Sequence, residues 1–387
     1  MGNNFTSINE QYINIRLLIG LKENEKLKEL NAILQCLFHV TPLVDYFKYK
    51  FDKIEDIESY KSFHKKKLCL TDSLKELIDK VWPKDVKGKR EGNLQEISKV
   101  EESKELLEII YKIKPDYDES QEFLINFIIM TLHKELNKVK NPNQKYVQSS
   151  QLSKELGLNA FKENMIKEHQ SKISDYCFGT YYMWTYCSNC RNNFYSFQPY
   201  MYGFYSLDQV YNYKFKTIQY RCNELYMNRM YNLYEVNIYD CLYFDTQVNY
   251  CMLTCKQCKM MTQCSFKNII YLSPKILIFI FNQNIFLYNA RFIIEEVINI
   301  SLFVEKKNFI NYNLIGIIYK HSQNNYRAFC KSPIDKQWYG YDDSKVQMMN
   351  NLQQIIMGHG IPYILFYQVS ENNNNNNINN NNINNNG

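Results

Sequence analysis

Hydrophobic residues recur with the spacing of an α-helix in two stretches of the first 140 residues. Between residues 20 and 37 the apolar side chains fall on one helical face, formed by Leu27, Leu30, Ile33, Leu34 and Leu37. Residues 118–137 carry a second such face, formed by Phe123, Phe127 and Met130 with Leu124, Ile128 and Leu132 beside them. Both stretches therefore predict amphipathic helices that bury one side against the body of a domain.

The pattern changes to short β-rich segments from about residue 181 onward. Residues 266–281 read as a strand, a break at Pro274 and a strongly apolar second strand, and residues 312–321 read as a further buried strand. From Glu371 the chain is almost pure asparagine, which cannot bury a core and is predicted to be disordered.

Composition narrows the function classes. The 387 residues are 45% hydrophobic, as expected of a chain with a real core. The formal charge of +6 comes from 46 basic and 40 acidic residues that are spread out, which favours a solvated surface over a nucleic-acid footprint. No stretch offers the ~20 uncharged apolar residues of a transmembrane helix, and no signal-peptide pattern is present. We therefore expect the protein in the cytoplasm or nucleus.

The first six residues fit the N-myristoylation pattern M-G-x-x-x-[ST], which would place a lipid on Gly2; the alternative is a frayed terminus.

The expected cytoplasmic or nuclear compartment also indicates the chemical state of the 12 cysteines. Disulfides are rare in the cytosol and nucleus, so these cysteines are expected to be thiols or metal ligands.

Four cysteines form two C-x-x-C pairs, Cys187 with Cys190 and Cys255 with Cys258. Two such turns brought together supply the four thiolates of a tetrahedral Zn²⁺ site. For a single pair, a redox dithiol or chance spacing would compete with this interpretation. Four thiolates leave no open coordination position, so the zinc would be structural and supply ~10 kcal/mol or more of folding free energy. The other cysteines nearby complete no further pair and are interpreted as buried or incidental thiols: Cys177, Cys222, Cys241, Cys251 and Cys264.

The stretch from Gly20 to Leu37, GLKENEKLKELNAILQCL, resembles the cysteine box of ubiquitin-specific proteases, G-L-x-N-x-G-N-T-C-Y-M-N-S-x-L-Q-C-L. The matching residues are Gly20, Leu21, Asn31, Leu34, Gln35, Cys36 and Leu37. The same ungapped alignment puts Lys28 at the position of the family's nucleophilic cysteine. It puts Glu23 at the asparagine that the family uses for the oxyanion.

Later motifs follow in the family's order. Residues 121–124 resemble the Q-Q-D-A-x-E-F-L box, and residues 312–321 resemble Y-x-L-x-x-V-x-x-H, which places His321 at a non-catalytic position of the family. Where the family reads G-H-Y, this chain reads Asn324-Asn325-Tyr326, so Asn325 occupies the position of the general base. Residues 338–343 resemble W-x-x-F-[DN]-D and put Asp342 at the third triad position; residues 362–367 resemble the closing A-Y-x-L-F-Y strand.

The resemblance implies an α+β, papain-like cysteine protease fold of the ubiquitin-specific protease type. It divides the chain into an N-terminal segment (1–14), a helical thumb (about 15–175), zinc-bearing β-fingers (about 176–270), a β-sheet palm (about 271–368) and the tail (369–387). In many family members, four cysteines hold a zinc ion at the tips of the fingers.

Thiol-protease hydrolysis needs a thiolate, a base and donors for the oxyanion. A protonated lysine is not a nucleophile, an asparagine amide cannot accept the proton, and a carboxylate at Glu23 would repel the developing negative charge. We also expect a helix starting at Glu25, capped by Asn24, to fill the space of the catalytic loop. Cys36 is disfavoured as a substitute nucleophile, because it falls on the buried side of the predicted helix.

The leading hypothesis is therefore an inactive homologue that binds ubiquitin or a ubiquitin-like protein as a module or scaffold. The alternatives are an active deubiquitinase that uses non-standard residues and a decayed copy that makes no ubiquitin contact. The sequence does not name other protein partners.

Overall fold

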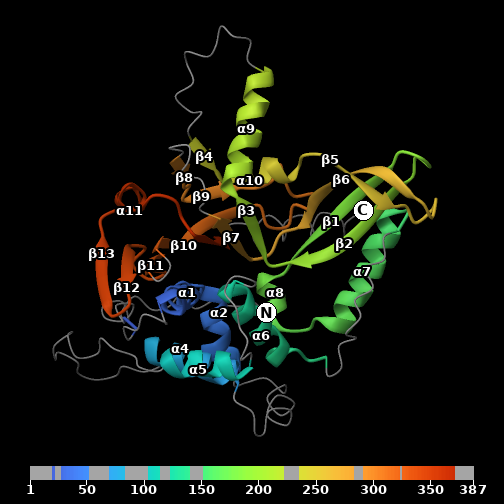
Figure 1. Ribbon diagram of the computed structural model, residues 1–387. Helices are drawn as coiled ribbons and strands as arrows, with labels where there is room; N and C mark the ends of the chain where they lie inside the picture. The colour runs from blue at the N-terminus through green and yellow to red at the C-terminus, as the bar shows by residue number, and fades with distance from the viewer. Residues whose placement is uncertain are drawn as a thin grey trace, which may run out of the picture. The chain divides into compact units, whose positions relative to one another are not determined.

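The computed structural model describes residues 20–21, 28–51, 69–82, 103–113, 123–139, 151–221, 235–282, 291–322 and 325–370. The chain forms two compact units. The first unit comprises Met1–Glu135 with Ile315–Gly358, and the second comprises Leu136–Leu314 with His359–Gly387. Figure 1 labels their helices and strands. The predicted division into thumb, fingers and palm stays a prediction, because compactness alone groups the chain in two.

The first unit combines helices with an antiparallel sheet. Its helices are α1 (Lys28–Phe38), α2 (Thr41–Asp45), the π-helical turn η3 (Tyr46–Lys50), α4 (Leu70–Val81), α5 (Ser103–Ile113), α6 (Leu124–Leu136) and α11 (Leu352–His359). Its strands are the later part of β10 (Asn311–Ser322), β11 (Asn325–Lys331), β12 (Trp338–Asp342) and β13 (Lys345–Met349), paired in the order β13-β12-β11-β10.

Helix α1 packs its apolar face against this sheet. Leu30, Ile33 and Leu34 are at most 1% exposed, as the helical spacing of the sequence predicts. At the contact, the Sγ atom of Cys36 on α1 lies 3.7 Å from that of Cys330 on β11. The sheet thus fixes where the two ends of α1 lie.

A carboxylate joins two of the other helices. Glu135 on α6 accepts hydrogen bonds from the backbone N–H groups of Leu70 (3.0 Å) and Thr71 (2.8 Å), the first residues of α4. These groups have no partner within their own helix, and the positive end of the helix dipole favours an anion there. Glu135 therefore serves as the cap that α4 lacks locally.

The second unit is mainly β. Its strands are β1 (Gly179–Cys187), β2 (Asn193–Tyr200), β3 (Tyr202–Ser206), β4 (Glu235–Asn237), β5 (Asn249–Thr254), β6 (Met261–Leu272), β7 (Ile276–Asn282), β8 (Arg291–Ile293), β9 (Val297–Asn299) and β14 (Ile364–Val369). Its helices are α7 (Lys154–Glu168), α8 (Lys172–Cys177), α9 (Leu207–Arg221) and α10 (Ile238–Asp245).

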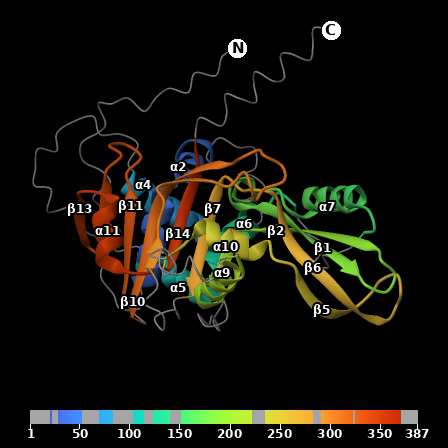
Figure 2. The same cartoon turned by 90° about the horizontal axis from the view of Figure 1, so that it is seen from above.

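The strands of this unit form three pairing groups, the smallest of which is β4 paired parallel with β8. Strands β2, β1, β6 and β5 form a four-stranded antiparallel sheet in that order, seen extended in Figure 2. Helix α7 lies along β2, where the ring of Phe161 packs 6.1 Å from that of Phe197. In the second sheet, β7 pairs antiparallel with β14 on one side and parallel with β3 on the other.

Several strand predictions are confirmed. Strand β6 ends at Leu272 and β7 begins at Ile276, on either side of the predicted break at Pro274. The six residues 276–281 of β7 are all buried. The segment 312–321 lies within β10, where His321 is exposed and its ring stacks on Tyr319 at 6.4 Å. Helix α6 confirms the helix predicted within 118–137 over the part that is described.

Other predictions fall outside the described residues. They concern the lipid at Gly2, the carboxylate of Glu23, the helix start at Glu25 and the asparagine-rich tail. Among the helices that are described, none has the length and apolar character required to cross a lipid bilayer.

Candidate functional site

The four cysteines of the two C-x-x-C pairs lie in two turns of the same construction. In the first turn, the N–H of Arg191 donates to the carbonyl of Cys187 at 2.9 Å; in the second, the N–H of Lys259 donates to the carbonyl of Cys255 at 2.8 Å. Arg191 and Lys259 both have positive φ angles, 60° and 57°. Each turn directs its two thiol groups inward.

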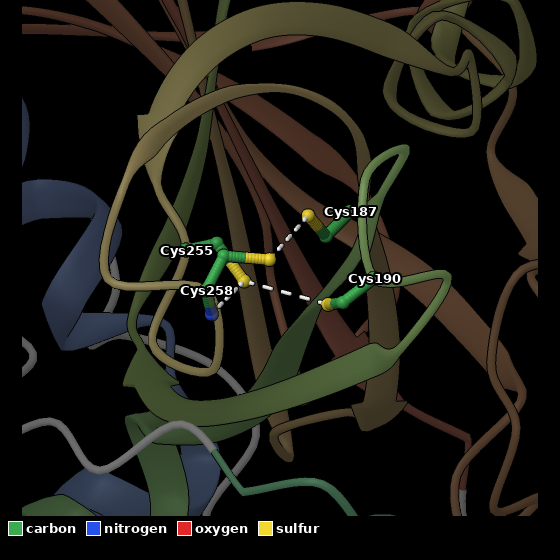
Figure 3. Close-up of side chains that lie close together, drawn as sticks. All are labelled: Cys187, Cys190, Cys255 and Cys258. Atoms are coloured by element: carbon green, nitrogen blue, oxygen red, sulfur yellow. Dashed lines mark hydrogen bonds between the residues drawn. The ribbon is translucent and has the colours of Figure 1, made fainter.

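Strand direction explains why the turns meet. Strands β1 and β5 each pair antiparallel with β6, so they run in the same direction and end at the same tip of the sheet. Cys187 is the last residue of β1, and Cys255 directly follows β5. Two cysteine pairs far apart in the sequence are therefore brought face to face by one intervening strand (Figure 3).

The geometry suits a tetrahedral metal. All four Sγ atoms lie within 4.8 Å of one another, with 3.9 Å between Cys187 and Cys258 and 3.7 Å between Cys190 and Cys255. Zinc–sulfur bonds of ~2.3 Å at tetrahedral angles place sulfurs ~3.8 Å apart. All four are free cysteines, and the two Sγ distances are too long for disulfide bonds. The structure thus confirms a four-cysteine group that fits a metal ion such as Zn²⁺.

Polar neighbours favour a thiolate in this group. The side chain of Thr262 lies 3.2 Å from the Sγ atom of Cys187, and its hydroxyl, with nearby backbone N–H groups, lowers the pKa of that thiol to about 6. Against a hydrogen bond from Asn189, burial and the neighbouring thiols raise the pKa of Cys258 to about 12. A metal ligand must be deprotonated, so the polar neighbours of Cys187 suit coordination, whereas the thiolate of Cys258 would need the charge of the bound metal ion.

A second candidate site lies in the first unit, around the first residue of α1. The ammonium of Lys28 is 3.9 Å from Oδ2 of Asp343, and the amide of Asn31 donates to Oδ1 of Asp343 at 2.7 Å. The side chain of Asp343 is only 4% exposed and that of Lys28 is 20% exposed. A lysine and a buried aspartate therefore form an ion pair at the beginning of the helix.

The turn between β12 and β13 positions Asp343. Its φ angle is 50°, and its carbonyl accepts a hydrogen bond from the N–H of Leu21 at 2.9 Å. Gly20 lies directly against the backbone of Ser344: a Cβ atom added to it would be 2.5 Å from the Ser344 carbonyl oxygen. The close approach of these two backbones thus requires glycine at position 20.

Little space remains at this site. The gap beside Lys28 does not admit a water molecule; it is lined by Lys28, Asn31, Ala32, Gln35, Tyr326, Tyr341 and Asp343. The side chains of α1 and the sheet fill it.

The other residues assigned from the sequence lie nearby in the same unit. Asn325 is the exposed first residue of β11, directly before the Tyr326 that lines the gap. Asp342 is the last residue of β12 and is paired with Lys345 in the strand register. The carboxylate that meets Lys28 is that of the next residue, Asp343. The sequence motif contained this aspartate, but pattern alone assigned it no role.

Two further side chains of this unit, those of His39 and Cys36, are buried. His39 has its Nδ1 atom 2.6 Å from the carbonyl of Gln35 and its Nε2 atom 3.3 Å from the hydroxyl of Tyr341. Burial lowers the pKa of His39 to about 4, so its ring is neutral at pH 7. Cys36 is fully buried beside Cys330, as its predicted side of the helix implied. No motif in the sequence indicated that His39 would lie close to this site.

A family model described as "Ubiquitin carboxyl-terminal hydrolase" matches residues 29–367, which is most of the chain. This chain belongs to the ubiquitin carboxyl-terminal hydrolase family. The match to the family begins at the residue directly after Lys28 and includes all four cysteines of the metal-binding group.

A curated relative of the family is "Ubiquitin carboxyl-terminal hydrolase 2" of Rattus norvegicus. The two proteins are 24% identical over 386 residues, which cover 91% of this chain and 54% of the rat protein. This family member therefore spans about half the length of that relative.

Solved structures show the fold. A chain of the "Ubp8-Sgf11-Sgf73-Sus1 SAGA DUB module" superposes with a TM-score of 0.57 at 17% identity, covering 92% of this chain and 68% of that chain. The same module "bound to ubiquitin aldehyde" gives a TM-score of 0.57 at 16% identity, covering 92% and 70%. The predicted α+β fold of the ubiquitin-specific protease type is thus confirmed.

Proposed function

We propose that this family member is catalytically inactive and acts as a binding module or scaffold for ubiquitin or a ubiquitin-like protein. The observation that carries the proposal is the Lys28–Asp343 ion pair. It occupies the start of the helix where the family resemblance expects a nucleophilic cysteine.

The chemistry of the replaced residues supports inactivity. An ammonium paired with a carboxylate has no free electron pair with which to attack a carbonyl carbon. Asn325, at the position of the base, carries an amide that does not accept a proton from a nucleophile. Loss of a triad residue lowers the rate by ~10⁴-fold or more in well-studied hydrolases. Replacing both roles leaves Asp342 with no histidine to orient.

An active deubiquitinase with non-standard residues is the second candidate. Near this site, among the described residues, the groups that offer such chemistry are the thiols of Cys36 and Cys330, which is also fully buried, and the imidazole of His39. Cys36 is fully buried and His39 is 2% exposed. Both ring nitrogens of His39 already have partners within the protein. A substrate bond would have to reach groups that the packing of α1 covers, which makes this candidate the weaker one.

Binding is the function that remains for an intact fold. A solved relative with this fold is a SAGA DUB module bound to ubiquitin aldehyde, and we extend ubiquitin recognition to this chain as part of the proposal. The zinc ion held by four thiolates would be structural, because no coordination position is left for a substrate. Further protein partners and a place in the cytoplasm or nucleus belong to the same proposal.

A suicide probe separates the two candidates. The purified full-length protein is incubated with ubiquitin that carries a thiol-reactive group at its C-terminus, and binding to mono-ubiquitin and ubiquitin-like proteins is measured by calorimetry. The expected result is saturable binding of one of these proteins without a covalent adduct. An adduct with the unmodified chain, or release of ubiquitin from a conjugate, would disprove inactivity.

A matched variant tests the assignment of the site. Lys28→Cys puts a thiol at the proposed nucleophile position and at the same time removes the ammonium that pairs with Asp343. If the variant forms an adduct on its new cysteine and the unmodified protein forms none, the alignment that puts Lys28 at the nucleophile position is supported. The same result would show that the ubiquitin C-terminus can reach this position. If neither the unmodified protein nor Lys28→Cys binds ubiquitin or a ubiquitin-like protein or reacts with the probe, the chain is a decayed copy and the proposed binding function is wrong.

A further inference from the structure

The second unit contains a cavity that takes no part in the sites described above. Its volume is about 180 Å³, and its lining residues come mainly from β1, β2, β3, β6, β7 and α10. An apolar cavity of ~150 Å³ is large enough for benzene, so this one has room for a group of similar or slightly larger size. The floor is apolar: Leu242 and Leu277 are each 2% exposed.

Aromatic rings form its walls. The rings of Tyr181 and Tyr200 lie 6.2 Å apart at an angle of 63°, and the rings of Tyr205 and Phe279 lie 6.1 Å apart at 40°. Phe204 also lines the cavity and is 48% exposed, so it marks the side that faces solvent. In the T-shaped pair the edge of one ring meets the face of the other, and a cation within ~6 Å of a free ring face is attracted to that face.

A single carboxylate provides the charge. Asp245, the last residue of α10, lines the cavity and accepts a hydrogen bond from the hydroxyl of Tyr205 at 2.5 Å. Within the described ranges this is its one side-chain hydrogen bond, and no Lys, Arg or His side chain forms an ion pair with it. Burial raises the pKa of Asp245 to about 6, so at neutral pH an anion faces the cavity.

A second polar group in the wall lacks a partner. The hydroxyl of Tyr200 is buried and makes no hydrogen bond. Its ring sits against Gly179, where an added Cβ atom would lie 2.4 Å from the ring, so the glycine is needed for this placement. A buried hydroxyl without a partner costs free energy unless a bound molecule supplies one.

We propose that this cavity binds a small alkylammonium group that still carries an N–H. The N–H donates to the carboxylate of Asp245, the charge lies against the rings of Tyr181 and Tyr200, and the alkyl part lies on the apolar floor. Two sources offer this chemistry: a free amine, or a methylated lysine side chain of another protein. This proposal does not depend on the proposed ubiquitin-binding function.

Charged and neutral probes of similar size test the proposal on the full-length protein. The free pair is N,N-dimethylbutylamine, which is protonated at pH 7.5, and N-butylacetamide. The second pair consists of one peptide with dimethyllysine and the same peptide with acetyllysine. By calorimetry, the cation of at least one pair is expected to bind ~10-fold or more tightly than its neutral counterpart. Binding of the free amine would assign a small-molecule ligand, and binding of the peptide alone would assign a protein side chain.

Two variants locate the site. Asp245→Asn keeps the size of the side chain and an acceptor for Tyr205, and it is expected to remove the preference for the cation. Asp175→Asn, which removes an exposed carboxylate on α8, is the matched control and should keep it. The proposal is wrong if neither cation binds, if amine and amide bind equally, or if Asp245→Asn binds the cation as the unmodified protein does. The first two outcomes need no variant to fold.

Discussion

The tip of the four-stranded sheet should depend on its metal. We consider the substitution Cys258→Ser, which removes one of the four thiolates while leaving the size of the side chain nearly unchanged. The buried cluster at this tip consists of Cys187, Phe194, Cys255 and Cys264, so Phe194 is its one residue that is not a cysteine. A core of this kind offers little hydrophobic stabilisation.

The magnitudes decide the outcome. Burying one phenylalanine contributes ~1.5–3 kcal/mol. Fixing the backbone of the two turns, roughly ten residues, costs ~10–20 kcal/mol of conformational entropy. A structural zinc ion contributes ~10–16 kcal/mol, which together with the phenylalanine offsets that cost to within a few kcal/mol. Without the metal, the balance is unfavourable, and the two turns should lose their order.

Metal content and hydrogen exchange measure this directly. The unmodified protein is expected to carry one zinc ion per chain by mass spectrometry of the metal, and Cys258→Ser substantially less. Amide exchange should rise at the ends of β1, β5 and β6, whereas α1 and β11 should keep their protection because their packing lies in the other unit.

A neighbouring cysteine provides the control. Cys251 lies opposite Cys264 in the strand register and is not one of the four grouped thiols. Cys251→Ser should therefore retain zinc and normal exchange. If the unmodified protein, produced with ample zinc, contains none and its tip is nonetheless protected, the reasoning about the tip is refuted.

Three further predictions concern the first unit. Lys28→Met removes the ammonium that pairs with the buried carboxylate of Asp343 and should lower the free energy of unfolding by ~1–3 kcal/mol in urea. Asp343→Asn added to it should recover part of the loss, and additive losses would contradict the ion pair. Burial lowers the pKa of His39 to about 4 in the folded protein, whereas an unfolded histidine has a pKa of ~6.5. The free energy of unfolding should therefore have its full value above pH ~6.5 and fall by on the order of 3 kcal/mol as the pH is lowered to ~4. His39→Gln should flatten this pH dependence, and an unchanged slope would exclude His39 as its source. Gly20→Ala should destabilise the unit because its Cβ atom would collide with the backbone of Ser344, whereas Ser344→Ala should be nearly neutral; equal melting temperatures for both variants would argue against the close approach.

Local pattern determined much of the fold. Helix α1 follows from the spacing of its leucines, and the ends of β6 and β7 follow from Pro274, which has no N–H to continue a strand ladder. The two cysteine pairs of the candidate metal site could also be identified from the sequence, because a C-x-x-C turn is a local structure that presents two thiols whatever surrounds it. The order of the family motifs was sufficient to predict the fold type.

Tertiary structure decided which distant groups meet. The two cysteine pairs face each other because β1 and β5 flank β6, and the sequence does not contain that strand order. Asp343 rather than Asp342 reaches Lys28, since neighbouring residues at the end of a strand point in different directions. The neutral state of His39 and the cavity at Asp245 arise from burial. Local patterns carry periodicity and turn chemistry, but burial and charge pairing depend on contacts between residues far apart in the chain.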